Sequence, residues 1–373
     1  MRTRSLRIAV SSLSLAATTL ITATATPAQA GPDRAPQTTR ATSTGVAPVF
    51  SATDRLAREV AATLAAPAVR DRVVAAVTAG PVDLLATRLD ARADRAAGSA
   101  NQAVLAAKGL PAATGSVLRL RLGHADMAAA LTRGETPLVA AASTDDALSS
   151  VVGYDPAGGQ VLLDPVRLPA RPVLVVEVDV AKAMARGLAQ VRQELAASGL
   201  SRTTSTMTTQ AGYWATKVNA VRLNDDKEPW VKGGAEIFDV VGGFGLDGKA
   251  TVNIVEMPYL DNDGTTYYPN QLLVHFNNYK YNLADVVMWE DDGDTNYRDL
   301  AKALITALLT VVDYGTYTPL VNAIIDAMPA SWWTDDPDYV DSWYTLSTAS
   351  SGRLNGAAAN GWMDVAPYWV QQL

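Results

Sequence analysis

The chain has 373 residues, a formal net charge of −7 and no cysteine. The lack of cysteine excludes disulfides, thiol nucleophiles and thiolate metal sites, and the length allows one or two ordinary domains with a sizeable core. Charge is unevenly spread, because residues 31–212 carry 19 Lys and Arg against 16 Asp and Glu, whereas residues 213–373 carry 9 against 22.

The first 30 residues have the pattern of a secretory signal peptide. A basic start, Arg2 to Arg7, precedes an apolar run from Ile8 to Ala25, and Ala28-Gln29-Ala30 forms an A-x-A cleavage site. We expect cleavage after Ala30 and a secreted, extracellular protein. Nowhere later does the sequence reach the ~18 uninterrupted apolar residues that a membrane-spanning helix needs.

Residues 53–200 predict an α+β first domain, preceded by a flexible lead-in over residues 31–52 that is rich in Thr, Pro and Ala. Helical periodicity over residues 53–109 predicts a small helical bundle. Short strand-like runs follow, and a helix is expected at 181–198 before a Ser- and Thr-rich linker at 201–212. The expected strands are 118–122, 137–142, 149–154, 161–163 and 172–180.

Residues 213–373 predict a second domain made mainly of antiparallel strands. Asn296 is positioned to cap a helix, and Thr318-Pro319 opens a second one that Pro329 closes. Many strands joined by polar loops predict a β-sandwich, here with a helical insertion. The acidic composition of this half excludes nucleic acid as a partner, since phosphates would be repelled. The expected strands are 214–223, 237–244, 251–255, 271–277, 282–289, 339–346 and 361–370.

The most distinctive stretch is Val286 to Asp299, in which an apolar strand leads into a run of acids. Carboxylates so close together repel one another unless a cation or solvent relieves them, and Ca²⁺ prefers six to eight oxygen ligands. Acids also cluster at other predicted strand ends, and in an antiparallel sandwich alternate loops emerge at the same end. These clusters are Asp225-Asp226 with Glu228, Asp261-Asn262-Asp263, and Asp335-Asp336 with Asp338. We therefore predict a calcium site, against the simpler reading of solvated acidic loops. Its candidate ligands are Asp225, Asp226, Glu228, Asp291, Asp292, Asp294 and Asn296.

This loop is not an EF-hand. Asp292, Asp294 and Asn296 form a D-x-D-x-N run, but Tyr297 occupies the position at which an EF-hand requires glycine. A glutamate at the twelfth position is also missing.

The sequence offers few catalytic groups. Its two histidines are His124, in an expected turn, and His275, which is expected inside a strand as a sheet residue. H-E-x-x-H, G-x-S-x-G, P-loop and dinucleotide motifs are absent. A secreted hydrolase with two catalytic carboxylates, for example one that acts on glycans, stays open as the alternative function.

The second half contains several distinctive motifs. They are Leu223-Asn224-Asp225-Asp226-Lys227-Glu228-Pro229-Trp230, Tyr268-Pro269-Asn270-Gln271, Asp294-Thr295-Asn296-Tyr297, Met328-Pro329 with Trp332, and Asp335-Asp336-Pro337-Asp338-Tyr339-Val340-Asp341. Together these motifs resemble an exported bacterial family, domain of unknown function three-one-zero-three. The resemblance spans residues 213–370 and implies no known activity.

A looser resemblance is to calcium-binding C2 domains, which carry aspartates in two loops at one end of an eight-stranded sandwich. Asp225-Asp226 and Asp292 with Asp294 resemble that pair, although the usual Asp-Pro-Tyr of the first loop is missing. The resemblance implies paired acidic loops, and binding to a membrane surface is the further property that C2 domains would imply. The sequence therefore predicts a calcium-binding extracellular module with a C2-like second domain.

Overall fold

The computed structural model describes residues 48–143, 149–201, 212–225, 230–232, 234–291, 293–313, 320–328 and 339–371. All of them belong to the compact unit Thr38–Leu373. The predicted signal peptide, most of the predicted lead-in and most of the predicted linker lie outside the described residues. So do three predicted ligands, Asp226, Glu228 and Asp292.

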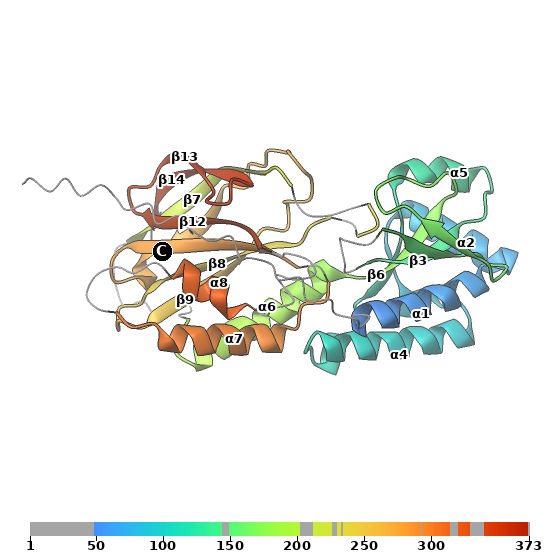
Figure 1. The fold of residues 1–373 in the computed structure, drawn as a ribbon, viewed down its shortest axis with the longest axis horizontal. Helices are drawn as coiled ribbons and strands as arrows, with labels where there is room; N and C mark the ends of the chain where they lie inside the picture. Colours follow the sequence, from blue (N-terminus) through green and yellow to red (C-terminus); the bar gives the residue numbers. More distant parts are fainter. Residues whose placement is uncertain are drawn as a thin grey trace, which may run out of the picture. The chain divides into compact units, whose positions relative to one another are not determined.

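The first half combines helices with a six-stranded mixed sheet of order β1-β2-β6-β3-β4-β5 (Figure 1). Aspartates begin several helices: Asp83, Asp90 and Asp179 each accept backbone N–H bonds as N-caps. The helices are α1 Pro48–Thr63, α2 Pro67–Ala79, α3 Leu84–Thr87, α4 Ala91–Ala107, α5 Ala128–Thr132 and α6 Val180–Ala197, with 3-10 turns at Ala112–Thr114 and Ala125–Met127. The strands are β1 Val82–Asp83, β2 Leu118–Leu122, β3 Leu138–Ala141, β4 Val151–Tyr154, β5 Gln160–Leu163 and β6 Val173–Val178.

Both faces of this sheet are buried near its centre. Strands β3 and β6 run parallel, whereas the other pairs are antiparallel. Leu174 and Val176 of β6 join the large hydrophobic cluster that contains α1 and α4, whereas Val173 and Val175 face a smaller cluster with Met127. The continuous apolar run of β6 thus reflects burial on both sides.

The second half contains two four-stranded antiparallel sheets, with orders β10-β7-β14-β13 and β12-β11-β8-β9. The strands are β7 Gly212–Leu223, β8 Ile237–Phe244, β9 Ala250–Glu256, β10 Gln271–His275, β11 Leu283–Glu290, β12 Tyr339–Ser347, β13 Gly352–Asn355 and β14 Gly361–Gln371, with a 3-10 turn at Phe276–Asn278. Helices α7 Tyr297–Thr310 and α8 Val321–Ala327 lie between β11 and β12 in the chain. The α+β fold class is confirmed, and the likeness to C2 domains stays a prediction.

Strand β8 separates two cores. Val241 packs with residues of both sheets, including Val218 of β7 and Val286 of β11. Phe238 and Val240 alternate with Val241 and instead join the large cluster, on the side of α6 and α7. The period-two alternation of a strand places these two sets on opposite faces.

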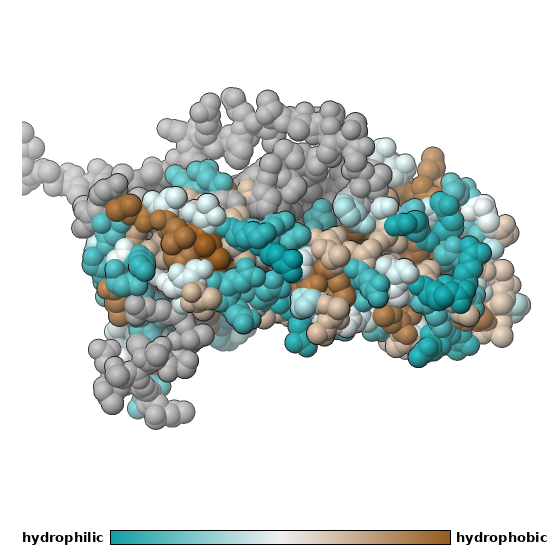
Figure 2. Space-filling model, turned by 90° about the horizontal axis from the view of Figure 1, so that it is seen from below, coloured by the Kyte–Doolittle hydropathy of each residue, from teal (hydrophilic) through white to brown (hydrophobic). Residues whose placement is uncertain are grey.

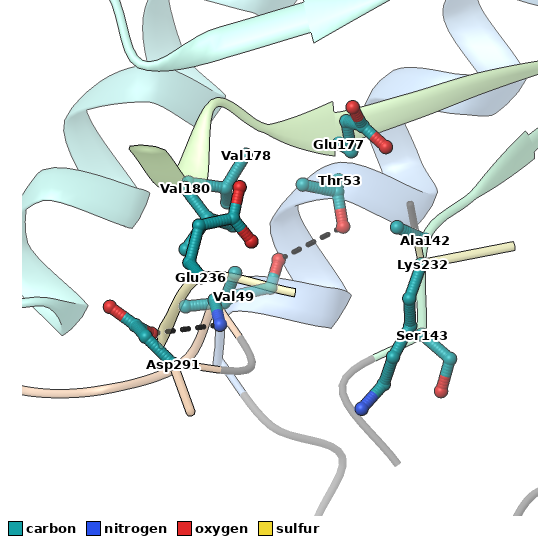
Figure 3. Close-up of a pocket in the computed structure, with 11 residues that line it drawn as sticks. Val49, Thr53, Ala142, Ser143, Glu177, Val178, Val180, Lys232, Glu236 and Asp291 are labelled. Carbon is teal, nitrogen blue, oxygen red and sulfur yellow. Dashed lines mark hydrogen bonds between the residues drawn. The ribbon is translucent and has the colours of Figure 1, made fainter. Parts of the chain in front are cut away.

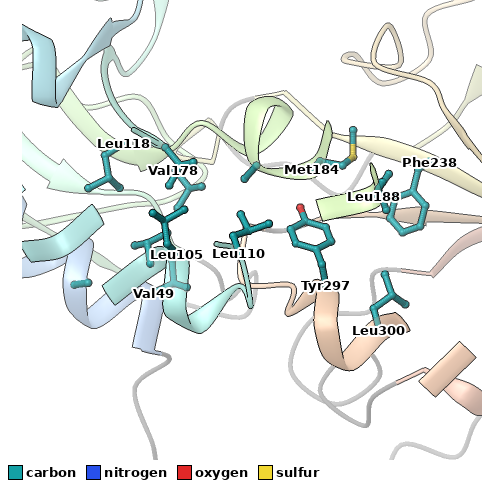
Figure 4. Close-up of a cluster of buried hydrophobic side chains, with 14 of the residues drawn as sticks. Val49, Leu105, Leu110, Leu118, Val178, Met184, Leu188, Phe238, Tyr297 and Leu300 are labelled. Carbon is teal, nitrogen blue, oxygen red and sulfur yellow. The ribbon is translucent and has the colours of Figure 1, made fainter. Parts of the chain in front are cut away.

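The large hydrophobic cluster continues from the first half into the second (Figure 4). Leu105 and Leu110 come from the first half, Tyr297 and Leu300 come from α7, and Leu188 comes from α6. Helix α6 therefore covers part of the second half. The division of the chain into domains at residues 201–212 stays a prediction.

On the face shown in Figure 2, hydrophobic residues gather in small patches separated by hydrophilic ones. Among the helices of the described residues, none is both long enough and apolar enough to cross a membrane.

Candidate functional site

Asp291, at the end of β11, is fully buried and faces the first half of the chain. Its Oδ1 accepts a hydrogen bond from the Gly293 N–H at 2.9 Å and lies 3.5 Å from Nζ of Lys108, which is also fully buried. Its Oδ2 accepts a hydrogen bond from the Tyr297 hydroxyl. Both carboxylate oxygens are thus engaged by groups of the protein.

Asn296 acts as the N-cap of α7, as the sequence predicts. Its Oδ1 accepts the Asp299 N–H at 3.1 Å, and its Nδ2 donates to the Ala107 carbonyl at the end of α4 at 2.7 Å. A side chain on Gly109 would meet this amide, because its Cβ would stand 2.6 Å from Asn296 Oδ1. The amide of Asn296 therefore joins α7 to α4.

Asp225 lies exposed beyond the end of β7, and Asp294 is half-buried in the loop before α7. The main chain of Asp225 is tied to Asn360, which accepts its N–H at 3.2 Å and donates to its carbonyl at 2.9 Å. The Asn360 N–H in turn donates to Asp341 of β12, which is paired with Met288 of β11. The ends of β7 and β11 therefore lie at the same end of the two sheets.

Asp341 organises this end of the sheets. Its buried carboxylate accepts N–H bonds from Ser342, Ala358, Asn360 and Gly361 at 2.8–3.0 Å. Such a set of donors satisfies a buried negative charge. The carboxylate thereby fixes the turn between β13 and β14 onto the neighbouring sheet.

A small pocket lined by both polar and apolar side chains lies beside Asp291 (Figure 3). Its polar lining includes Glu177 at the end of β6, Glu236 before β8, Lys232 and Ser143. The cavity volume is about 30 Å³. A single water needs about 10–15 Å³ measured in this way, so there is room for one or two waters or an ion.

The carboxylates of the pocket differ in how their charge is balanced. Glu177 is paired with Arg119 and with Arg121, whose Nε lies 2.6 Å from Glu177 Oε2. Burial raises the pKa of Glu236 to about 8, opposed by Arg119 and reinforced by the nearby Asp291 and Glu177 carboxylates. Glu236 therefore carries a proton in much of the population at neutral pH. Glu177 differs in that two arginines balance its charge.

In the parts of the chain that the structure describes, no three carboxylate or imidazole side chains lie close enough together to hold a metal ion. The sequence pointed to Asp291 but gave no signal for Lys108, Glu177 or Glu236, which come from three other segments. Their only sequence signal is a charged residue beside an apolar run, a common pattern on exposed elements. Of the histidines, His275 lies in β10 as predicted, and His124 caps the turn at Ala125–Met127.

The sequence matches the family described as "Protein of unknown function (DUF3103)" over residues 53–373. The chain belongs to this family. The match begins in α1 and therefore includes Lys108 and Glu177, in addition to the second half in which the sequence motifs lie. No curated protein and no solved structure matches the chain significantly. Membership of the family carries no known activity, and the function has to be argued from the residues.

Proposed function

We propose that the protein is a secreted calcium-binding module with a binding or structural role outside the cell. The observation that carries the proposal is the shared position of two acidic strand ends. Asp225 follows β7 and Asp294 follows β11, and the Asn360–Asp341 network ties these strand ends to one end of the two sheets. Carboxylates from two loops are what a calcium ion requires.

Asp291 is engaged by Lys108, Gly293 and Tyr297, and the Asn296 amide is used in capping. We keep as proposed ligands the acids that follow the two strand ends in sequence. They are Asp225, Asp226, Glu228, Asp292 and Asp294. Backbone carbonyls and water would complete the six to eight oxygens.

The alternative, a hydrolase with two carboxylates, needs room for its substrate. Pockets for small-molecule ligands measure about 300–1,000 Å³. The pocket that contains Glu236 and Asp291 has a cavity volume of only about 30 Å³. A groove beside β5 is larger, at about 350 Å³, and among the residues that the structure describes Asp164 is the one carboxylate that lines it. Neither of these two pockets combines room for a substrate with a pair of carboxylates, and this favours binding over hydrolysis.

The test is the thermal stability of the full mature chain in calcium, in magnesium and in chelator. Extracellular calcium modules have Kd of about 10⁻⁴–10⁻³ M, so 10 mM calcium should add about 1.4–2.7 kcal/mol to the free energy of unfolding. Magnesium should add less, because it gives up its hydration water reluctantly.

The double variant Asp292→Asn with Asp294→Asn should lose the calcium response. The matched control is Asp247→Asn, in the exposed turn between β8 and β9 at the opposite end of the sheets, which should keep it. Identical melting curves of the wild type in calcium and in chelator would refute the proposal.

A further inference from the structure

Three fully buried polar side chains meet between α4, β11 and α7. Lys108 is the C-cap residue of α4, Asp291 follows β11, and Tyr297 opens α7. Lys108 Nζ lies 3.5 Å from Asp291 Oδ1 and 5.1 Å from the centroid of the Tyr297 ring. Burial of an ion pair costs several kcal/mol in lost hydration, so such a pair contributes little stability by charge attraction alone.

The same three residues have the geometry of an amide-forming site. The contact places a primary amine 3.5 Å from Oδ1 of the Asp291 carboxyl group, so the amine lies next to the group that it would have to attack. Gly293 N–H holds Oδ1 and the Tyr297 hydroxyl holds Oδ2. Donors on both oxygens polarise a carboxyl group and stabilise the oxyanion that forms when a nucleophile adds to it.

The positions of these groups are fixed by packing. Gly187 of α6 and Gly109 after α4 leave room for Tyr297 and Asn296, since a Cβ on either glycine would stand closer than 3.0 Å to atoms of its neighbour. The Tyr297 N–H also donates to the Lys108 carbonyl at 3.1 Å. Amine and carboxyl group are thus held together in a site without bulk water, which lowers the cost of bringing them to reaction.

A proton carrier lies beside the pair. Glu236 lines the same pocket as Asp291, and its carbonyl accepts the Asp291 N–H at 3.1 Å. The pKa of about 8 that burial gives Glu236 lets it hold a proton at neutral pH. It can therefore exchange a proton with the neighbouring Asp291 carboxyl group through water in the shared pocket, as a general acid and base does.

We propose that Lys108 and Asp291 join in an intramolecular amide bond. A bond forms between Lys108 Nζ and Asp291 Cγ, while the bond from Cγ to Oδ2 breaks. Oδ2 leaves as water with two of the three ammonium protons, relayed through Glu236, and Oδ1 stays as the amide oxygen on the Gly293 N–H. Ammonium and carboxylate thus give an amide and water, with no oxidation and no cofactor. The cavity of about 30 Å³ has room for the water released.

Such a bond would connect two residues 183 positions apart, in a chain that has no cysteine for a disulfide. A cross-link over so long a loop restricts the unfolded chain more than one over a short loop. The bond would therefore link the first half covalently to the second, in a protein that we propose is secreted.

The experiment is the intact mass of the purified full chain, measured after denaturation. The wild type should be lighter than its sequence mass by about 18 Da, the mass of one water. A tryptic digest should contain one branched peptide that carries both Lys108 and Asp291. A wild-type chain with its full sequence mass, or a branch at any other pair, would overturn the proposal.

Variants test the roles of the side chains. Lys108→Arg keeps a positive charge without a primary amine and should show the full sequence mass, whereas Lys182→Arg, at an exposed position of α6, should keep the deficit. Glu236→Gln should lose most of the deficit, and a full deficit in this variant would remove Glu236 from the reaction. The bond can form only in a folded chain, so the thermal unfolding transition of each variant is recorded before its mass is measured, and only variants that fold are compared. A simple buried ion pair predicts the full sequence mass for every chain.

Discussion

Replacing Gly187 of α6 by any other residue should destabilise the protein, because the ring of Tyr297 occupies the space that a side chain would need. A Cβ built on Gly187 stands closer than 3.0 Å to three atoms of that ring, whereas ordinary carbon contacts are about 3.5–4.0 Å. Tyr297 cannot retreat, since it is fully buried and its hydroxyl is bonded to Asp291. Gly187→Ala must therefore displace the ring or bend the helix.

The expected cost follows from three contributions. Overpacking a core costs about 1–3 kcal/mol, and weakening the hydrogen bond to a buried carboxylate adds about 1.5–3 kcal/mol. Alanine regains about 1 kcal/mol of helix propensity over glycine. We expect a net loss of about 1.5–5 kcal/mol in the free energy of unfolding, measured by urea denaturation followed through tryptophan fluorescence.

The matched control is Gly98→Ala in α4. Gly98 also lies inside a helix, but nothing stands within 4 Å of its Cβ position. The same substitution there should stabilise the protein by up to about 1 kcal/mol. In a chain that carries Tyr297→Leu, Gly187→Ala should lower the free energy of unfolding by less, because the smaller leucine leaves room for the alanine side chain. Equal effects of alanine at positions 187 and 98 would refute this account of the contact between α6 and α7.

Two further predictions concern buried carboxylates. Because the folded-state pKa of Glu236 is about 8 and its ordinary value is 4.5, the folded chain keeps a proton that the unfolded chain releases between these values. The contribution of Glu236 to stability should therefore fall as pH rises from about 4.5 to 8, by at most about 1.4 kcal/mol per pH unit. The difference in unfolding free energy between the wild type and Glu236→Gln, followed across this range, should show that fall, and a constant difference would contradict it. Asp341→Asn replaces one acceptor oxygen by an NH₂ group among four N–H donors, so we expect a loss of about 2–4 kcal/mol in chemical denaturation, and an unchanged midpoint would show that the turn between β13 and β14 holds without the carboxylate.

Most secondary structure could be predicted from the sequence because it depends on local patterns. The expected strands at 118–122 and 237–244 coincide with β2 and β8, and the helix expected at 181–198 is α6 within one residue at each end. Alternation, turn residues and caps act over a few positions and are visible in one dimension. Strands β1 and β13 were missed, since they are two and four residues long and carry little pattern.

The acidic stretch at the end of β11 shows where the sequence was insufficient. The sequence predicts that Asp291 and Asn296, like the acidic residues beside them, supply oxygen ligands from an open loop. The fold instead buries Asp291 against Lys108 and uses the Asn296 amide to join two helices.

The sequence by itself therefore determined most of the helices and strands, the acidic strand ends and the family to which the chain belongs. Only the tertiary structure decided which acids point inward, because Lys108 and Asp291 stand 183 positions apart and meet only once α4 packs against the start of α7. The charge state and chemistry of a carboxylate depend on burial and on the charges around it. The burial of a carboxylate and the charges around it cannot be read from the residue or from its sequence neighbours. Both are set by segments that the fold brings together.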